Sequence, residues 1–189
     1  MLLPPSAFVS YVERGNRMTH SDSLSAITDS LILAVTGRAR HLPVDTALTS
    51  DSLTRLRMLP ELEAIVRQAA LQKNRGEIAL PPLLDSLIES AGRRYGLAIV
   101  GSGFGRRRGN YAGQSAKALG VGLLTLGMYV PIPYKSGLTV LTFVLDAETD
   151  RVAFFGRTGQ LEKDPTTEEA VERQLIESMR GFYYPARRR

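Results

Sequence analysis

The spacing of apolar residues divides the first part of the chain into short elements. From Ala7 to Glu13, β-branched and aromatic residues occupy both alternating sets of positions, which predicts a strand covered on both faces. Thr19-His-Ser-Asp22 is a candidate capping box, and apolar residues then recur at three- and four-residue steps as far as Gly37. This spacing predicts a helix. Leu42 to Val44 is a further candidate strand, interrupted by proline.

Helical spacing continues in two later stretches. Pro60 interrupts the first, so we expect two short helices or one kinked helix between Ser50 and Asn74. Pro81-Pro82 opens the next helix, and Gly92 lies near its end. Leu97 to Val100 is a compact apolar run bounded by glycines, a pattern typical of a buried central strand.

The last third of the chain contains the strongest local signals. Residues 101–134 are rich in glycine; the ends are typical of loop, and the middle favours either a small-residue helix or a loosely packed strand. Leu138 to Leu145 and Arg151 to Arg157 flank a turn-rich link and predict a β-hairpin. The final helix is predicted to begin with Asp164 as its cap and Pro165 in its first turn.

These elements together predict an α/β protein with an α+β-like mixed sheet. We expect a single two-layer sandwich in which helices pack on the sheet, with a late β-hairpin followed by a C-terminal helix. A chain of 189 residues fits one domain. We expect residues 1–183 to form that domain and residues 184–189 to be a basic C-terminal tail.

The formal charge of +5 comes from two arginine clusters, residues 106–108 and 187–189. Without these six arginines, 18 basic and 19 acidic side chains remain. A nucleic-acid-binding domain normally spreads Lys and Arg along a groove or a helix face, so we expect no nucleic-acid partner. The chain has no Cys, and His20 and His41 lack a metal-ligand spacing. We therefore expect no catalytic residue, no cofactor and no metal.

The glycines at 101, 103 and 105 follow a predicted strand and invite comparison with a dinucleotide-binding turn. The third glycine of that fingerprint is replaced by Arg106, and no acidic residue follows about 20 positions later. The adjacent side chains Arg106, Arg107 and Arg108 are the candidate site for a partner or an anion, because guanidinium groups bind oxyanions with two parallel hydrogen bonds. The alternative interpretation, without a binding role, is a solvated loop tip. The alternative function is a phosphate- or nucleotide-binding enzyme centred on residues 101–109.

Residues 116–133 form an apolar stretch, uncharged from Ala118 onward. Glycines and prolines interrupt it, and it is shorter than the ~20 residues of a membrane span. Its side chains need cover from the protein core, from another protomer or partner, or from a membrane surface, since an exposed patch of this size promotes aggregation.

The order and the amino-acid composition of several segments resemble those of a known family. They are the Leu-Pro-Pro of residues 3–5 before the first strand, Leu97 to Val100, the Lys117-Ala-Leu-Gly-Val-Gly segment, Val140 to Thr149, and Val152 to Phe155. The chain resembles small secreted lipoproteins of Gram-negative bacteria, whose domain is similar to the amino-terminal domain of TolB and to the outer-membrane activators of penicillin-binding proteins.

This resemblance implies a non-catalytic protein in the periplasm, anchored to the outer membrane by a lipid, that binds other envelope proteins or associates with itself. In that family, residues 146–149 mark a hairpin turn and not a catalytic site. The lipidated Cys that should precede the domain is absent. We therefore expect that the sequence begins after the leader, with Met1 as an added start; the alternative location is the cytoplasm.

Overall fold

A single mixed β-sheet forms the centre of the protein. The computed structural model describes residues 1–13, 17–39, 42, 44–49, 52–71, 78–106 and 134–182. Within these residues, five strands are arranged in the order β2-β1-β3-β4-β5. β1 and β3 are parallel and the other neighbouring pairs are antiparallel, which confirms the predicted mixed sheet. The strands are β1 (Ser6–Val12), β2 (Met18–His20), β3 (Tyr95–Arg106), β4 (Ser136–Asp146) and β5 (Arg151–Arg157).

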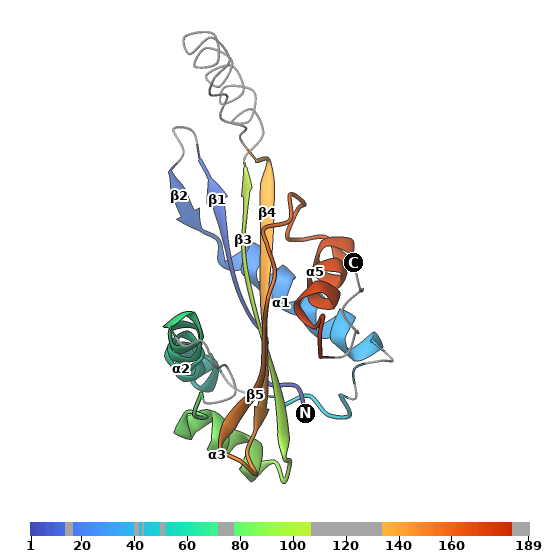
Figure 1. Cartoon of the computed structure of the whole chain (residues 1–189). Helices are drawn as coiled ribbons and strands as arrows, with labels where there is room; N and C mark the ends of the chain where they lie inside the picture. The colour runs from blue at the N-terminus through green and yellow to red at the C-terminus, as the bar shows by residue number, and fades with distance from the viewer. Residues whose placement is uncertain are drawn as a thin grey trace.

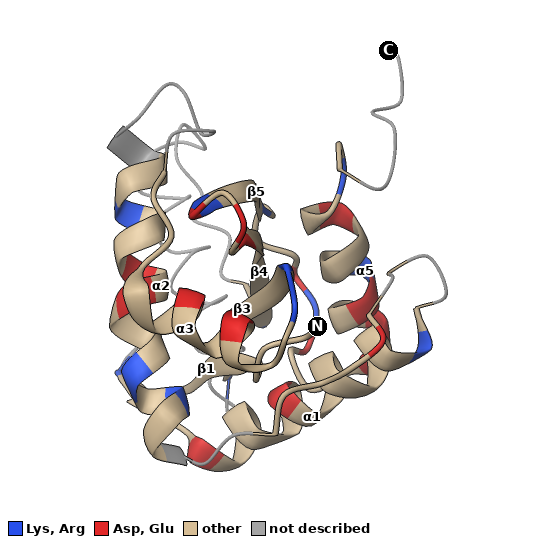
Figure 2. Ribbon diagram, turned by 90° about the horizontal axis from the view of Figure 1, so that it is seen from below, with Lys and Arg blue, Asp and Glu red and all other residues tan. Residues whose placement is uncertain are grey.

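Helices pack on both faces of this sheet (Figure 1). The described helices are α1 (Asp22–Arg38), α2 (Ser52–Leu71), α3 (Pro82–Ser90) and α5 (Glu168–Ser178). Figure 2 shows α1 and α5 on one side of the strands and α2 and α3 on the other. Leu97 and Ile99 of β3 lie in the core beneath α1 and α5, and Ala98 lies in the core beneath α2 and α3. The sandwich therefore has three layers where the prediction had two, because apolar residues cover both faces of β3.

The hairpin and most of the helices agree with the predictions. β4 and β5 pair antiparallel around a turn at residues 147–150, as predicted. Residues 52–71 form one helix with Pro60 inside it. The next residue, Glu61, accepts hydrogen bonds from the N–H groups of Leu83 (3.4 Å) and Leu84 (3.1 Å). The carboxylate of Glu61 thus caps the start of α3, which has no side-chain cap of its own.

The caps of two helices differ from the predictions. Ser21 caps α1, with its Oγ accepting from the N–H of Leu24 (3.4 Å), whereas Thr19 belongs to the unpredicted short strand β2. α5 begins at Glu168 with Thr167 in the N-cap position, and Asp164 instead accepts from the N–H of Thr166 (2.9 Å) in the preceding turn. Ser, Thr and Asp are all good caps, so neighbouring candidates cannot be ranked from sequence alone.

Residues 1–3 extend the sheet beside β3. The N–H of Leu97 donates to the Met1 carbonyl and the N–H of Leu3 donates to the Leu97 carbonyl, each at 2.8 Å. On its other side, Leu2 forms a β-bridge with Ala47. Neither Leu42 nor Val44 lies in a strand, so the predicted strand between them is wrong; Ala47 is the residue in this region that pairs.

Some predicted features fall outside the described residues. They include the apolar stretch 116–133, the segment beginning at Lys117 and the tail 184–189. In the part of the chain that the structure describes, none of the helices combines the length and apolar character needed to traverse a bilayer.

Candidate functional site

The glycines of the candidate nucleotide turn lie within β3. Gly101, Gly103 and Gly105 pair with β1 on one side and with β4 on the other. This segment is extended, so the prediction of a loop beginning at Gly101 is wrong. A side chain at Gly103 would come within 2.7 Å of the Gly137 carbonyl and 3.0 Å of Pro165. Close packing explains that glycine without any phosphate ligand.

The arginine cluster is only partly described. Arg106 is the last residue of β3 and is half-buried. Its Nε donates to the carbonyl of Tyr134 (2.6 Å), and its backbone N–H donates to the carbonyl of Lys135 (3.1 Å). Arg107 and Arg108 lie outside the described residues. The guanidinium of Arg106 thus binds the start of the chain leading into β4.

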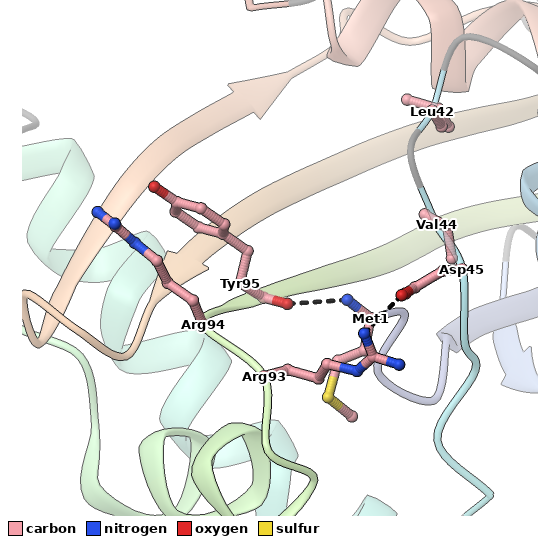
Figure 3. A pocket seen from close by; sticks show the side chains of 7 residues that line it. All are labelled: Met1, Leu42, Val44, Asp45, Arg93, Arg94 and Tyr95. Atoms are coloured by element: carbon pink, nitrogen blue, oxygen red, sulfur yellow. Dashed lines mark hydrogen bonds and ion pairs between the residues drawn. The ribbon is translucent and has the colours of Figure 1, made fainter.

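A hollow in the described surface lies at the opposite end of β3 from Arg106. Two adjoining cavities of about 490 and 470 Å³ share Met1, Val44 and Tyr95 in their walls. We call them together the Tyr95 groove. The first cavity is also lined by Leu42, Asp45, Arg93 and Arg94, and the second by Gly96, Leu97, Val144 and Phe182. Figure 3 shows the first cavity.

Main-chain hydrogen bonds hold Met1 in the floor of the groove. The Met1 ammonium donates to the carbonyl of Tyr95 (2.8 Å), as Figure 3 shows. Burial lowers the pKa of this ammonium group, and Asp45 acts in the opposite direction. The Met1 side chain is buried, so it contributes apolar surface to both cavities.

Arg93 and Asp45 form an ion pair across the first cavity (Figure 3). One terminal nitrogen of Arg93 lies 2.6 Å from Asp45, and the other donates to the hydroxyl of Thr46 (2.9 Å). Desolvation alone would raise the pKa of Asp45, but Arg93 and neighbouring hydrogen bonds hold it below its ordinary value. Asp45 is therefore an anion at neutral pH.

Arg94 lies between an aromatic ring and two carboxylates. It donates from Nε and from one terminal nitrogen to the two oxygens of Asp146, both at 3.1 Å, and it also pairs with Glu148. Its guanidinium lies 4.8 Å from the centre of the Tyr95 ring. The hydrogen bonds from Arg94 lower the pKa of Asp146, and the same hydrogen bonds raise the pKa of Arg94. The carboxylates thus hold Arg94 in place against Tyr95.

We expect Arg94→Gln to lower the free energy of unfolding at neutral pH, because the carboxylate of Asp146 loses the two hydrogen bonds that Arg94 donates. The folded-state pKa of Asp146 is depressed, so its contribution is present above the ordinary carboxyl pKa and is lost as pH falls through the folded value. The difference between wild type and variant should therefore shrink in acid.

Urea denaturation at about pH 7, and at the lowest pH where the wild type stays folded, measures this difference. Arg67→Gln is the control: Arg67 and its partner Glu63 are both exposed, and we expect a change below about 0.5 kcal/mol. A loss for Arg94→Gln that does not depend on pH would contradict the role given to Asp146.

Two exposed aromatic residues border the second cavity. Tyr95 is 46% exposed and Phe182 is 45% exposed. The Phe182 ring packs 5.0 Å from the ring of Phe154, which fixes its position. Val44, Leu97 and Val144 contribute apolar side chains to the wall of the same cavity. The groove therefore offers an apolar floor, two aromatic edges and a rim of paired charges.

Sequence reasoning missed this groove. Its residues come from the start of the chain, from residues 42–45 and 93–97, from β4 and from the turn after α5. The one local signal is the Arg93-Arg94-Tyr95 run, which follows Gly92 and precedes a predicted buried strand. Gly92 has a φ of 64°, a conformation that suits glycine and turns the chain from α3 into β3.

The described residues show no group of three or more His, Cys, Asp or Glu side chains arranged to hold a metal ion. Comparison with known proteins adds no further guide: no family model matches the chain, and no curated protein matches it. The functional argument therefore depends on the groove itself.

Proposed function

We propose that this protein is a non-catalytic protein-interaction module of the bacterial cell envelope, periplasmic and anchored to the outer membrane by a lipid, and that it binds partner proteins in the Tyr95 groove. The observation that carries the binding role is the Arg94–Tyr95 pair, held by Asp146 at the edge of an apolar cavity. The location in the envelope depends on the family resemblance alone.

The composition of the groove matches that of a protein interface. Tyr and Arg are among the residues that contribute most to binding energy in such interfaces, and they act best beside an apolar floor enclosed by a polar rim. Arg94 is held by two carboxylates and Phe182 is stacked on Phe154, so little side-chain entropy remains to be lost on binding. These features favour a preformed docking site.

The charges of the groove indicate the chemistry of the partner. Asp45 is paired with Arg93, and Arg94 is paired with Asp146 and Glu148. A phosphate or nucleotide would have to displace one of these carboxylates, whereas an apolar side chain can enter the second cavity without breaking an ion pair. The proposed ligand is therefore an uncharged, apolar segment of a partner protein that inserts an anchor side chain between Tyr95 and Phe182.

We expect Tyr95→Ala to weaken the binding of such a partner by about tenfold or more. The substitution removes one aromatic edge of the groove, and it removes the ring against which the Arg94 guanidinium lies. Tyr134→Ala is the matched control, since Tyr134 is 48% exposed and lies beside Arg106, at the opposite end of β3 from Tyr95. A photo-crosslinking residue at position 95 or 134 identifies the partner in cells, and titration of the purified partner gives the dissociation constants.

Crosslinking to one protein from position 95 but not from position 134, together with weaker binding by Tyr95→Ala alone, would support the proposal. Equal affinities for the two variants, or no crosslinked protein from position 95, would refute it. Cell fractionation tests the location separately: recovery of the protein with the cytoplasmic fraction would overturn the envelope assignment and leave the binding role standing.

A further inference from the structure

The end of the sheet opposite the Tyr95 groove brings four parts of the backbone together. Val12 of β1 pairs with Met18 of β2 and with Arg106 of β3. The N–H of Arg106 donates to the carbonyl of Lys135 (3.1 Å), just before β4. Figure 1 shows these strand ends at the top of the view, away from α3 and from the turn between β4 and β5. The Arg106 end is our name for four described residues: Arg17, Met18, Arg106 and Lys135.

Basic residues are concentrated in the two connections that join these strand ends. In the sequence, residues 13–18 and 106–135 contain seven of the 24 Lys and Arg residues and one of the 19 Asp and Glu residues. These connections therefore have a formal charge of +6, whereas the rest of the chain, with 17 basic and 18 acidic residues, has a charge of −1. Of the seven basic residues, the structure describes Arg17, Arg106 and Lys135.

Two carboxylates lie near these cations without balancing them. The N–H of Glu13 donates to the carbonyl of Arg17 (2.8 Å), which places Glu13 at the same turn. Glu162 accepts a hydrogen bond from the N–H of Lys135 (3.2 Å). Three described cations and two carboxylates leave this end with a positive charge, so it attracts an anionic surface.

Exposed apolar side chains adjoin the cations on the β1–β2 side. Met18, directly after Arg17, is 62% exposed, and Phe8 on the same face of the sheet is 42% exposed. The surface of a bilayer accommodates both kinds of side chain, because anionic headgroups attract Lys and Arg while apolar side chains enter the layer beneath them. A nucleic-acid backbone offers the phosphates but no apolar layer for Met18. The combination therefore favours a lipid surface.

We propose that the Arg106 end docks on the surface of a bilayer that contains anionic phospholipids. β3 has 12 residues, so Tyr95 lies about 36 Å from Arg106 along this strand. Docking through the Arg106 end holds the Tyr95 groove away from the lipid, where partner proteins can reach it. This inference goes beyond the proposed protein-binding function and does not depend on the lipid anchor, so either proposal can fail without the other.

Sedimentation of the full chain with lipid vesicles measures the docking. We expect binding to vesicles of phosphatidylglycerol and phosphatidylcholine in equal parts to be about tenfold or more tighter than binding to pure phosphatidylcholine, and to weaken as salt is added. Replacing both exposed cations, Arg17→Gln with Lys135→Gln, should weaken binding by about tenfold or more, because each Lys or Arg near an anionic surface contributes a factor of about five.

The matched control removes the same charge elsewhere. Arg57 in α2 and Arg151 at the start of β5 are both exposed. Arg57→Gln combined with Arg151→Gln should change vesicle binding by less than about twofold, since electrostatic attraction to the surface falls off within a Debye length of about 10 Å.

The orientation is tested with a single fluorescent residue, because the chain contains no Trp. In Met18→Trp, we expect the emission to shift to shorter wavelength on the anionic vesicles and to be quenched by brominated lipid. Tyr95→Trp, at the opposite end of β3, should show neither change.

Three results would overturn the proposal. The first is no binding of the wild-type chain to the anionic vesicles. The second is quenching of Tyr95→Trp as strong as that of Met18→Trp, and the third is an equal loss of binding in the two pairs of charge substitutions. Binding of the wild type to a single-stranded oligonucleotide but not to the vesicles would assign the cations to nucleic acid instead.

Discussion

Gly156→Ala is expected to be the most damaging single-methyl substitution in the described part of the protein, costing about 3 kcal/mol or more of unfolding free energy. A methyl group at Gly156 would lie 1.7 Å from the carbonyl oxygen of Ser178. Because that atom belongs to the backbone, no side-chain rotation relieves the overlap. The substitution must therefore push the end of α5 away from β5.

The end of α5 is attached at this point by other contacts as well. Thr142 lies opposite Gly156 on the neighbouring strand, and its hydroxyl is 2.5 Å from the hydroxyl of Ser178. Gln174, one turn earlier in α5, donates to the carbonyls of Leu138 (2.6 Å) and Gly159 (3.0 Å). Displacement of α5 would break these buried hydrogen bonds, which adds to the cost of the overlap.

Thermal and urea unfolding of Gly156→Ala and Gly105→Ala measure this effect. Gly105 also lies in a strand, but a methyl group there would have no atom within 4 Å. We expect Gly105→Ala to be neutral or to gain up to about 1 kcal/mol, since alanine restricts the unfolded chain. A Gly156→Ala variant within about 0.5 kcal/mol of the wild type would show that α5 does not pack as closely as described.

The close approach at Gly156 illustrates what sequence patterns can and cannot predict. The hairpin of β4 and β5 and the final helix were predicted, because each depends on signals within one short segment. The packing of Ser178 on Gly156 is a contact between two elements, and no pattern within a single segment predicts it. The run from Gly101 to Gly105 misled for the same reason: Gly103 allows the Gly137 carbonyl and Pro165 to approach β3 closely, and all three glycines lie in an extended strand and do not form a turn.

The candidate site was harder to predict than the fold. The arginine cluster was conspicuous in the sequence, yet Arg106 uses its side chain to bind the chain near Tyr134. The Tyr95 groove is assembled from five separate parts of the chain, and its apolar floor consists of ordinary core side chains that the ends of the elements leave partly uncovered. The pairing of residues 1–3 with β3 on one side and with Ala47 on the other brings three of those parts together.

The buried carboxyl of Asp29 leads to the second large effect, on the pH dependence of stability. Its folded-state pKa of about 6 lies above the ordinary value of 3.8, so between these values the folded protein binds a proton that the unfolded chain has lost. Stability associated with Asp29 is therefore full below about pH 4, falls as pH rises through about 6, and changes little above that. The full shift would correspond to about 3 kcal/mol, and solvent screening of this partly exposed carboxylate reduces the amount observed.

Asp29→Asn should abolish this dependence. We expect the variant to equal the wild type in unfolding free energy near pH 4 and to exceed it by about 1–3 kcal/mol near pH 7, because the amide carries no charge to bury. Subtracting the wild-type curve from the variant curve cancels the contributions of the other carboxyl groups. Urea denaturation at half-unit pH steps provides both curves.

Asp150→Asn is the matched control for this comparison. Asp150 is an exposed turn residue with a φ of 51°, a conformation that aspartate and asparagine both tolerate. The unfolding free energy of Asp150→Asn should therefore stay within about 0.5 kcal/mol of the wild-type value at every pH. A variant at position 29 that is less stable than the wild type at pH 7 would mean that the ion pair with Arg55 outweighs the cost of burial. In that case the ion pair, in which a terminal nitrogen of Arg55 in α2 lies 3.2 Å from Asp29 in α1, would stabilise the contact between the two helices.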